Sequence, residues 1–131
     1  MSETPEAMEA IAQTVLTAMG SEDVAAFAEL LDPNVTWGAP DAPHPTCKNR
    51  KQVLSWYERG RESGVRGQAS EVAVFGDRLL VTLTVRGTQG AQERGGVALR
   101  WQVLTVRDGR IIDIVGFDDR MDAMARVGVP G

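Results

Sequence analysis

The sequence predicts an α+β fold, in which helices and strands occupy separate parts of one chain. In the first half, apolar residues recur every three or four positions, which is the period of an amphipathic helix. Between residues 71 and 117 the apolar residues alternate with polar ones and are often β-branched, which is typical of strands. Because the helices come first and the strands follow as hairpins, a parallel α/β sheet is not expected.

The first two helices are predicted to form a hairpin. Thr4-Pro5 pairs a capping side chain with a proline at the first helical position, and Gly20 ends this helix. Its apolar stripe consists of Met8, Ile11, Val15 and Met19. Ser21 is expected to cap the second helix, which Asp32-Pro33 ends because the residue before a proline disfavours helical dihedrals. The apolar residues of this second helix are Val24, Phe27, Ala28 and Leu31.

A short strand, a loop and a third helix follow. Residues 34–37 predict the strand, and residues 38–46 a stiff surface loop, because the three prolines of GAPDAPHPT are incompatible with a helix or a central strand. Asn49 and Gln52 form a capping-box pattern that opens the third helix. Its apolar residues are Val53, Leu54, Trp56 and Tyr57, and Gly60 and Gly64 mark its end.

Four strands then form two predicted hairpins. They cover residues 71–75, 79–85, 97–107 and 111–117. The first pair flanks a turn at Gly76-Asp77-Arg78, and the second flanks Asp108-Gly109, the strongest hairpin signal in the chain. Residues 88–96 predict a polar, glycine-rich connection between the hairpins. A short final helix is expected over residues 118–127, capped by Asp118 or Asp119.

The composition is that of an ordinary globular protein. The chain has 131 residues, of which 43% are hydrophobic and 24% charged, so a single domain over residues 1–131 can bury a core. The net charge of −4 and the scattered basic residues argue against a nucleic-acid partner. With one cysteine and one histidine, neither an internal disulfide nor an ordinary zinc site is possible, and no metal or other cofactor is expected.

The sequence also favours a location in the cytoplasm. No apolar run approaches the roughly 20 residues that cross a bilayer, so no membrane partner is expected. The start, MSETPEAMEA, is acidic and lacks the basic-then-apolar layout of a signal peptide.

This order of elements resembles the nuclear transport factor 2-like superfamily, and in particular its SnoaL-like branch. The most specific stretch is RWQVLTVRDGRIIDIVGFDDR, residues 100–120, which is similar to the superfamily's last hairpin with its aromatic-acid pair. The opening helix and the stretch FAELLDPNVTW that follows it, residues 27–37, are similar to the start of the family's domain. The resemblance implies a cone, in which a curved antiparallel sheet wraps around the helices and encloses a pocket. It also implies a homodimer joined through the outer face of the sheet.

Ketosteroid isomerase-like chemistry finds no complete residue set in this chain. The resemblance puts Trp37 where the carboxylate base would lie and Gln102 where the protonated acid would lie. Asp41 or His44 could replace the base only if the proline-rich loop folds inward. A scytalone dehydratase-like site would rely on histidine, and the single histidine lies in that loop.

Two other catalytic residue sets of the superfamily differ in how well they match this chain. The epoxide hydrolase-like set is absent, because its positions match the aliphatic residues Val81, Leu83 and Val115. A cyclase-like acid–base pair is harder to exclude, because the substrates of such enzymes have very acidic protons. His44 with Asp41 or Asp118 could supply that pair, since imidazole titrates near neutral pH.

Each candidate pocket residue has a functional and a structural interpretation. If Gln102 faces the cone interior, so does Arg100, because alternate residues of a strand share a face; otherwise Arg100 is solvated. Trp37 and Trp56 can line the pocket or simply fill the core, and Tyr57 can offer its phenol to a ligand or lie partly exposed.

Two further residues carry alternatives of the same kind. Asp118 is better interpreted as a helix cap than as a catalytic acid. Cys47 lies before a helix N-terminus that would lower its thiol pKa, although a buried structural cysteine is the better interpretation.

Three functions remain open at this point. The leading one is a SnoaL-like protein that binds a small apolar or weakly acidic molecule, through Trp37, Trp56, Tyr57, Arg100 and Gln102. The second is an acid–base enzyme of cyclase, isomerase or dehydratase type acting on a small cyclic substrate. The third is a non-catalytic scaffold for dimerisation or interaction.

Overall fold

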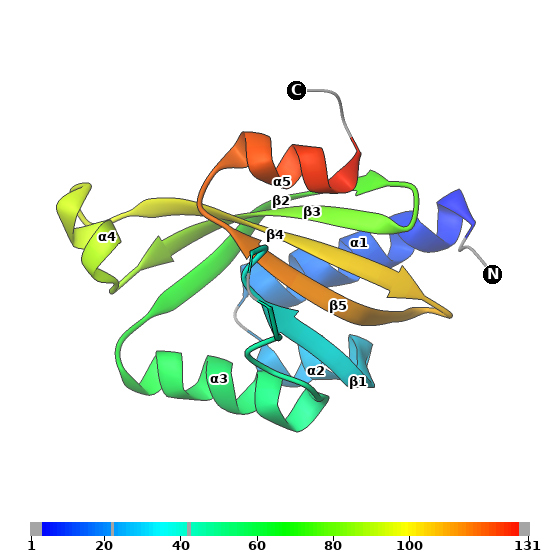
Figure 1. Cartoon of the computed structure of the whole chain (residues 1–131), viewed down its shortest axis with the longest axis horizontal. Coiled ribbons are helices and arrows are strands. Elements are labelled where there is room, and N and C mark those ends of the chain that lie inside the picture. The colour runs from blue at the N-terminus through cyan, green and yellow to red at the C-terminus, as the bar shows by residue number, and fades with distance from the viewer. Residues whose placement is uncertain (1–3, 22, 42, 129–131) are drawn as a thin grey trace.

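The computed structural model describes residues 4–21, 23–41 and 43–128, which form one five-stranded sheet with helices on both faces (Figure 1). The first three residues and the last three of the predicted domain, and Ala42 of the predicted loop, lie outside the described residues. None of the described helices is long and apolar enough to cross a membrane.

Helix α1 spans Pro5–Gly20, and its predicted cap is confirmed, because the Ala7 N–H donates to the Thr4 hydroxyl oxygen at 3.1 Å. Helix α2 spans Val24–Leu30. Ser21 does not cap it, since the Ser21 hydroxyl donates back to the Thr17 carbonyl at 2.7 Å and closes α1. Asp23 takes that role because it directly precedes α2 and accepts the Ala26 N–H at 3.1 Å.

Strand β1 spans Leu31–Gly38, longer than the predicted strand, so Leu31 belongs to the sheet and not to the second helix. It pairs in parallel with β5, Arg110–Phe117, at one edge of the sheet. Pro33 is tolerated there because an edge strand has one side without ladder hydrogen bonds. The loop after β1 returns to this strand. Trp37 of β1 and Cys47 exchange two backbone N–H···O hydrogen bonds, at 3.0 and 2.9 Å.

Helix α3 spans Arg50–Glu62. The Gln52 N–H donates to the Asn49 side-chain oxygen at 2.9 Å, as the capping-box pattern predicts. The reciprocal bond comes from one residue further back, because the Gln52 side-chain oxygen accepts the N–H of Lys48 at 2.8 Å. The start of α3 is therefore fixed by its own sequence.

The remaining strands run antiparallel in the order that the two hairpins predict. They are β2 at Arg66–Phe75, β3 at Arg78–Arg86 and β4 at Ala98–Arg107, followed by β5. The sheet order is β1-β5-β4-β3-β2, so the predicted α+β class is confirmed, with β1 as a parallel addition at the edge. Strand β2 starts before the predicted Glu71. The sequence does not reveal this start, because the exposed first part of the strand lacks an apolar alternation and the register shifts between Ala69 and Glu71.

Two short helices complete the structure. Helix α4, Gln89–Glu93, lies within the predicted polar connection and is capped by Thr88. Helix α5, Arg120–Val127, is capped by Asp119, whose side chain accepts from Met121 and Asp122 at 2.8 and 3.2 Å. Asp118 is therefore not the cap, because the helix starts one residue too late for its side chain to reach the orphan N–H groups.

The sheet buries both of its faces, and strand alternation decides which residue goes to which side. Leu104 and Val106 of β4 belong to the larger core under α1, α2 and α3. Val103 of the same strand packs with Ala123 of α5 on the opposite face. Figure 1 shows α1 crossing one side of the sheet and α5 lying over the other.

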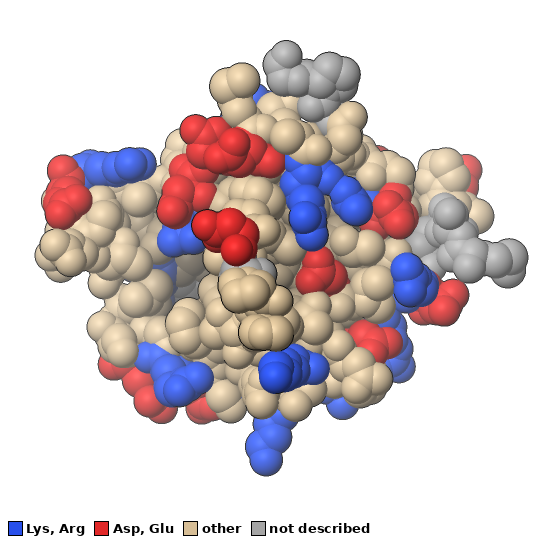
Figure 2. All heavy atoms as spheres, viewed as in Figure 1, with Lys and Arg blue, Asp and Glu red and all other residues tan. Residues whose placement is uncertain are grey.

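Charged side chains are spread over the surface. On the face shown in Figure 2, the described Lys and Arg residues stand in small groups among Asp and Glu residues. The absence of a nucleic-acid partner stays a prediction.

Candidate functional site

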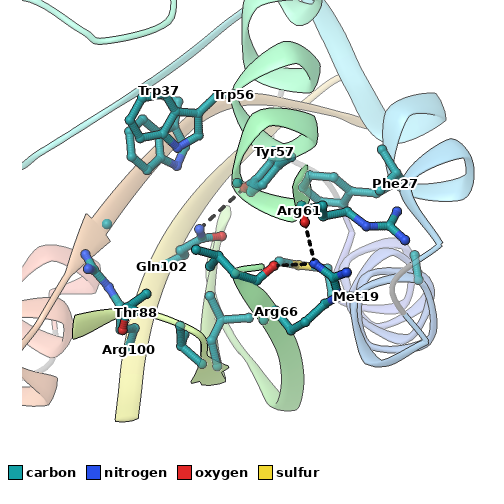
Figure 3. A pocket seen from close by; sticks show the side chains of 18 of the residues that line it. Met19, Phe27, Trp37, Trp56, Tyr57, Arg61, Arg66, Thr88, Arg100 and Gln102 are labelled. Atoms are coloured by element: carbon teal, nitrogen blue, oxygen red, sulfur yellow. Dashed lines mark hydrogen bonds between the residues drawn. The ribbon is translucent and has the colours of Figure 1, made fainter. Parts of the chain in front are cut away.

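A cavity of about 270 Å³ lies between the helices and the sheet (Figure 3). Its walls come from α1, α2, α3, β1, β3, β4 and β5, and from the segment that opens β2. The lining residues are Ala18, Met19, Asp23, Val24, Phe27, Trp37, Trp56, Tyr57, Gly60, Arg61, Val65, Arg66, Gly67, Leu83, Val85, Thr88, Arg100, Gln102 and Gly116. Most of these side chains are apolar, and the volume lies just below the roughly 300–1,000 Å³ of pockets for drug-sized ligands.

The five residues that the sequence predicts for the pocket all line this cavity. Gln102 and Arg100 share one face of β4, and that face is the cavity side. Trp37 of β1 and Trp56 of α3 form an aromatic pair with ring centroids 5.1 Å apart. That these residues bind a ligand stays a prediction.

Gln102 is the polar centre of the cavity. It is 7% exposed, the buried polar residue of a core that is otherwise apolar in the described part of the chain. Its side-chain Nε2 donates to the Tyr57 hydroxyl oxygen at 3.4 Å, a long hydrogen bond between β4 and α3 (Figure 3). Its Oε1 has no hydrogen-bond partner among the described residues, and neither has the buried indole N–H of Trp37.

Tyr57 is held by aromatic packing as well as by this bond. Its ring meets Phe27 of α2 edge to face, with centroids 5.9 Å apart. Burial raises the pKa of the Tyr57 hydroxyl to about 12; the hydrogen bond from Gln102 lowers it in part, and the nearby Cys47 raises it slightly. At neutral pH the phenol is therefore protonated and can donate a hydrogen bond.

Spectrophotometric titration tests this pKa, because Tyr57 is the only tyrosine of the chain. We expect half-ionisation near pH 12, against an ordinary value of 10. Since the folded-state pKa is the higher one, the stability linked to Tyr57 is fully present below pH 10 and is lost as the pH rises toward 12. Gln102→Leu should raise the pKa further, because it removes the hydrogen bond that favours the phenolate; half-ionisation near the ordinary value would contradict the buried hydroxyl.

Three arginines lie around the cavity, of which the sequence predicted only Arg100. Its side chain is 45% exposed and pairs with the exposed Asp118 at 3.2 Å. Arg61 and Arg66 are exposed at the surface, so they mark the mouth. The Arg66 guanidinium donates to the backbone carbonyls of Arg61 and Val65 at 2.8 and 2.9 Å, which holds it across the connection between α3 and β2 (Figure 3).

The sequence carried a signal for one of the missed arginines. Arg61 follows Tyr57 by four residues, and residues four apart share a helix face, so a pocket-facing Tyr57 implies a pocket-facing Arg61. Arg66 lies before residue 71, where the sequence predicts the strand to start, so no strand alternation assigns it to the cavity. Asp23 was missed because the cap was assigned to Ser21.

The candidate acid–base residues do not come together. His44 and Asp41 are exposed in the loop, and neither is among the lining residues of the cavity. Asp118 pairs with Arg100 at the surface. Among the described residues, Asp23 is the carboxylate that lines the cavity, and its oxygen is engaged as the cap of α2.

Two other sequence interpretations are settled by position. Val115 does not match a cavity position, because it packs under α5; its neighbour Gly116 lines the cavity instead. Cys47 is 2% exposed, and burial raises its thiol pKa more than the nearby Arg59 lowers it, as expected for a structural cysteine. No group of three or more His, Cys, Asp and Glu side chains within the described ranges could hold a metal ion.

Comparison with known proteins adds a family and a fold. A model of the SnoaL-like domain matches residues 12–114. No curated protein is significantly similar to the chain in sequence.

Solved structures with the same fold cover most of the chain. Bal32a, from a soil-derived mobile gene cassette, is 23% identical, with a TM-score of 0.67 over 92% of this chain and 98% of that one. A candidate polyketide cyclase from Sinorhizobium meliloti is 21% identical, with a TM-score of 0.64 over 84% and 97%. A candidate ketosteroid isomerase from Kribbella flavida is 16% identical, with a TM-score of 0.67 over 88% and 79%. Similarity at this level of identity shows the fold.

Proposed function

The chain belongs to the SnoaL-like domain family, and we propose that it binds a small, largely apolar, neutral or weakly acidic molecule in the cavity. The observation that carries this proposal is the buried amide of Gln102, whose oxygen faces no partner among the described residues. An unsatisfied buried polar atom costs about 1–3 kcal/mol, so a hydrogen-bond partner in the cavity would stabilise the protein. A ligand that meets this oxygen removes the penalty.

The size and polarity of the cavity support a ligand with one or two rings. The walls contributed by Phe27, Trp37 and Trp56 are aromatic, and those contributed by Leu83 and Val85 are aliphatic. Flat apolar rings bury well against such surfaces. The few polar groups then fix the orientation of the molecule.

Charge at the mouth favours a weakly acidic ligand over a basic one. Three guanidinium groups, from Arg61, Arg66 and Arg100, line the cavity. Among the described residues, Asp23 is the one carboxylate that lines it, and Asp118 pairs with Arg100 at the surface. The chain as a whole has a net charge of −4, so this local excess of positive charge runs against the average. Arginine also offers several donors to an acidic oxygen.

An acid–base enzyme is the second candidate, and the geometry favours it less. A general base must reach the substrate proton and have a pKa near the working pH. The pKa of Tyr57, about 12, lies far above neutral pH, and the side-chain oxygen of Asp23 is engaged as the cap of α2. The proposal is therefore binding without an identified reaction.

Calorimetric titration with 2-naphthol at neutral pH tests the binding proposal. This two-ring molecule carries one weakly acidic hydroxyl, and we expect saturable binding of one molecule per chain. Absence of binding by 2-naphthol at its solubility limit would contradict the proposal.

A second measurement separates binding from catalysis. Proton exchange at the carbon next to the carbonyl of 2-tetralone, followed in heavy water by nuclear magnetic resonance, should run at the rate of buffer alone. Exchange accelerated by the protein would favour the acid–base enzyme.

The homodimer joined through the outer sheet face also stays a prediction. Light scattering tests it, because it measures the mass of the protein in solution.

A further inference from the structure

We propose that the group of the ligand deepest in the cavity is a hydroxyl, and that the cavity discriminates against a ketone on the same ring skeleton. This inference rests on the proposed function and names the chemistry that the buried Gln102 and the half-buried Tyr57 recognise together. It is carried by the hydrogen bonds that these two side chains make and by those that they leave open.

The amide of Gln102 uses a donor and leaves its acceptor open. Nε2 donates to the Tyr57 hydroxyl oxygen at 3.4 Å, while Oε1 is buried without a partner in the described part of the chain. The two side chains come from β4 and α3, so the pair spans the cavity between sheet and helix. The pair is therefore not a set of donors aimed at one oxygen, as an oxyanion site requires.

Tyr57 supplies a hydrogen-bond donor that complements the open acceptor of Gln102. Its oxygen accepts from Gln102, and no acceptor for its own proton is found among the residues that the structure describes. The phenol is protonated at neutral pH, as an ordinary tyrosine is, and its raised pKa of about 12 keeps it so over a wider range of pH. The pair thus presents one acceptor, Gln102 Oε1, and one donor, the Tyr57 O–H.

A hydroxyl satisfies both groups at once. Its proton is donated to Gln102 Oε1, and its oxygen accepts from the Tyr57 O–H. A ketone oxygen accepts from Tyr57 but leaves Oε1 unpaired and places two acceptors close together. Sites built to bond a hydroxyl reject analogues that lack it, because the buried polar group then has no partner.

The test compares 2-tetralol with 2-tetralone, which share one ring skeleton and differ in the alcohol and ketone groups. We expect calorimetry to show that the tighter-binding enantiomer of 2-tetralol binds about tenfold more tightly than 2-tetralone. Equal or tighter binding of the ketone would overturn the inference. The binding proposal would survive that result.

Variants localise the discrimination. Gln102→Leu keeps the approximate volume but removes the acceptor, so the alcohol and ketone should then differ by less than about twofold. Gln13→Leu makes the same change on an exposed face of α1 and should keep the tenfold difference. If Gln102→Leu, shown to fold by its melting transition, retains the difference, the inference is overturned. If neither molecule binds the wild type while 2-naphthol does, the inference fails alone; if none of the three binds, the proposed function fails with it.

Discussion

Gly87→Ala is expected to lower the free energy of unfolding by about 3 kcal/mol, the largest loss expected for a Gly→Ala substitution at the described glycines. Gly87 has φ of +83°, and a Cβ there would overlap the Gly64 carbonyl oxygen and lie 2.8 Å from its carbon. The obstacle is backbone on both sides, so no side chain can rotate away. Either the end of β3 or the connection after α3 must move.

Chemical denaturation measures this loss, and Gly95→Ala is the matched control. Gly95 has φ of +85°, but a Cβ there would meet nothing beyond its chain neighbours within 4 Å, so its substitution adds left-handed strain without the overlap. We expect about 1 kcal/mol for Gly95→Ala. Equal losses in the two variants would show that the contact between Gly87 and Gly64 does not constrain the fold.

Gly116→Leu is expected to weaken 2-naphthol binding at least a hundredfold while the protein stays folded. Gly116 lies on β5 opposite Gln102, and its φ is not positive, so a side chain brings no backbone strain. A Cβ there would lie 3.8 Å from an Arg100 nitrogen and 3.9 Å from a Trp37 carbon, both ordinary contacts. The rest of the leucine would occupy the space that the ligand needs.

The control places the same side chain on the other face of the sheet. Thr84 alternates with Leu83 and Val85 on β3, so Thr84→Leu adds a leucine away from the cavity and should leave the affinity unchanged. Melting transitions of both variants show whether they are folded. If Gly116→Leu binds 2-naphthol as tightly as the wild type, the binding site lies elsewhere.

The fold could be predicted to a large extent, because local signals and pairing agree in this chain. The cap at Thr4, the capping box at Asn49 and the Asp108-Gly109 turn each fix an element by short-range contacts. The resemblance to the SnoaL-like branch is confirmed by the matching family model. The parallel pairing of β1 with β5 was not predicted, because it joins residues about 80 apart and leaves no local pattern.

The site could be predicted only in part, and the reason is the two-sided burial of the sheet. Alternation groups Arg100 with Gln102 correctly, but it cannot say which face holds the cavity when α5 covers the other. The same ambiguity put Val115 at a cavity position that belongs to Gly116. A one-residue shift in how a strand is matched to the family exchanges its two faces. Matching site residues one by one is therefore least reliable in the strands.

The two tryptophans beside the cavity give the protein an intrinsic spectroscopic signal for events in the cavity. Trp37 and Trp56 lie 5.1 Å apart at an interplanar angle of 38°, close enough for their excited states to couple. The chain has three tryptophans, and the third, Trp101, packs on the far side of the sheet with the core under α5. Near-ultraviolet circular dichroism and intrinsic fluorescence therefore report mainly on the cavity, without a label and without any substitution in its walls.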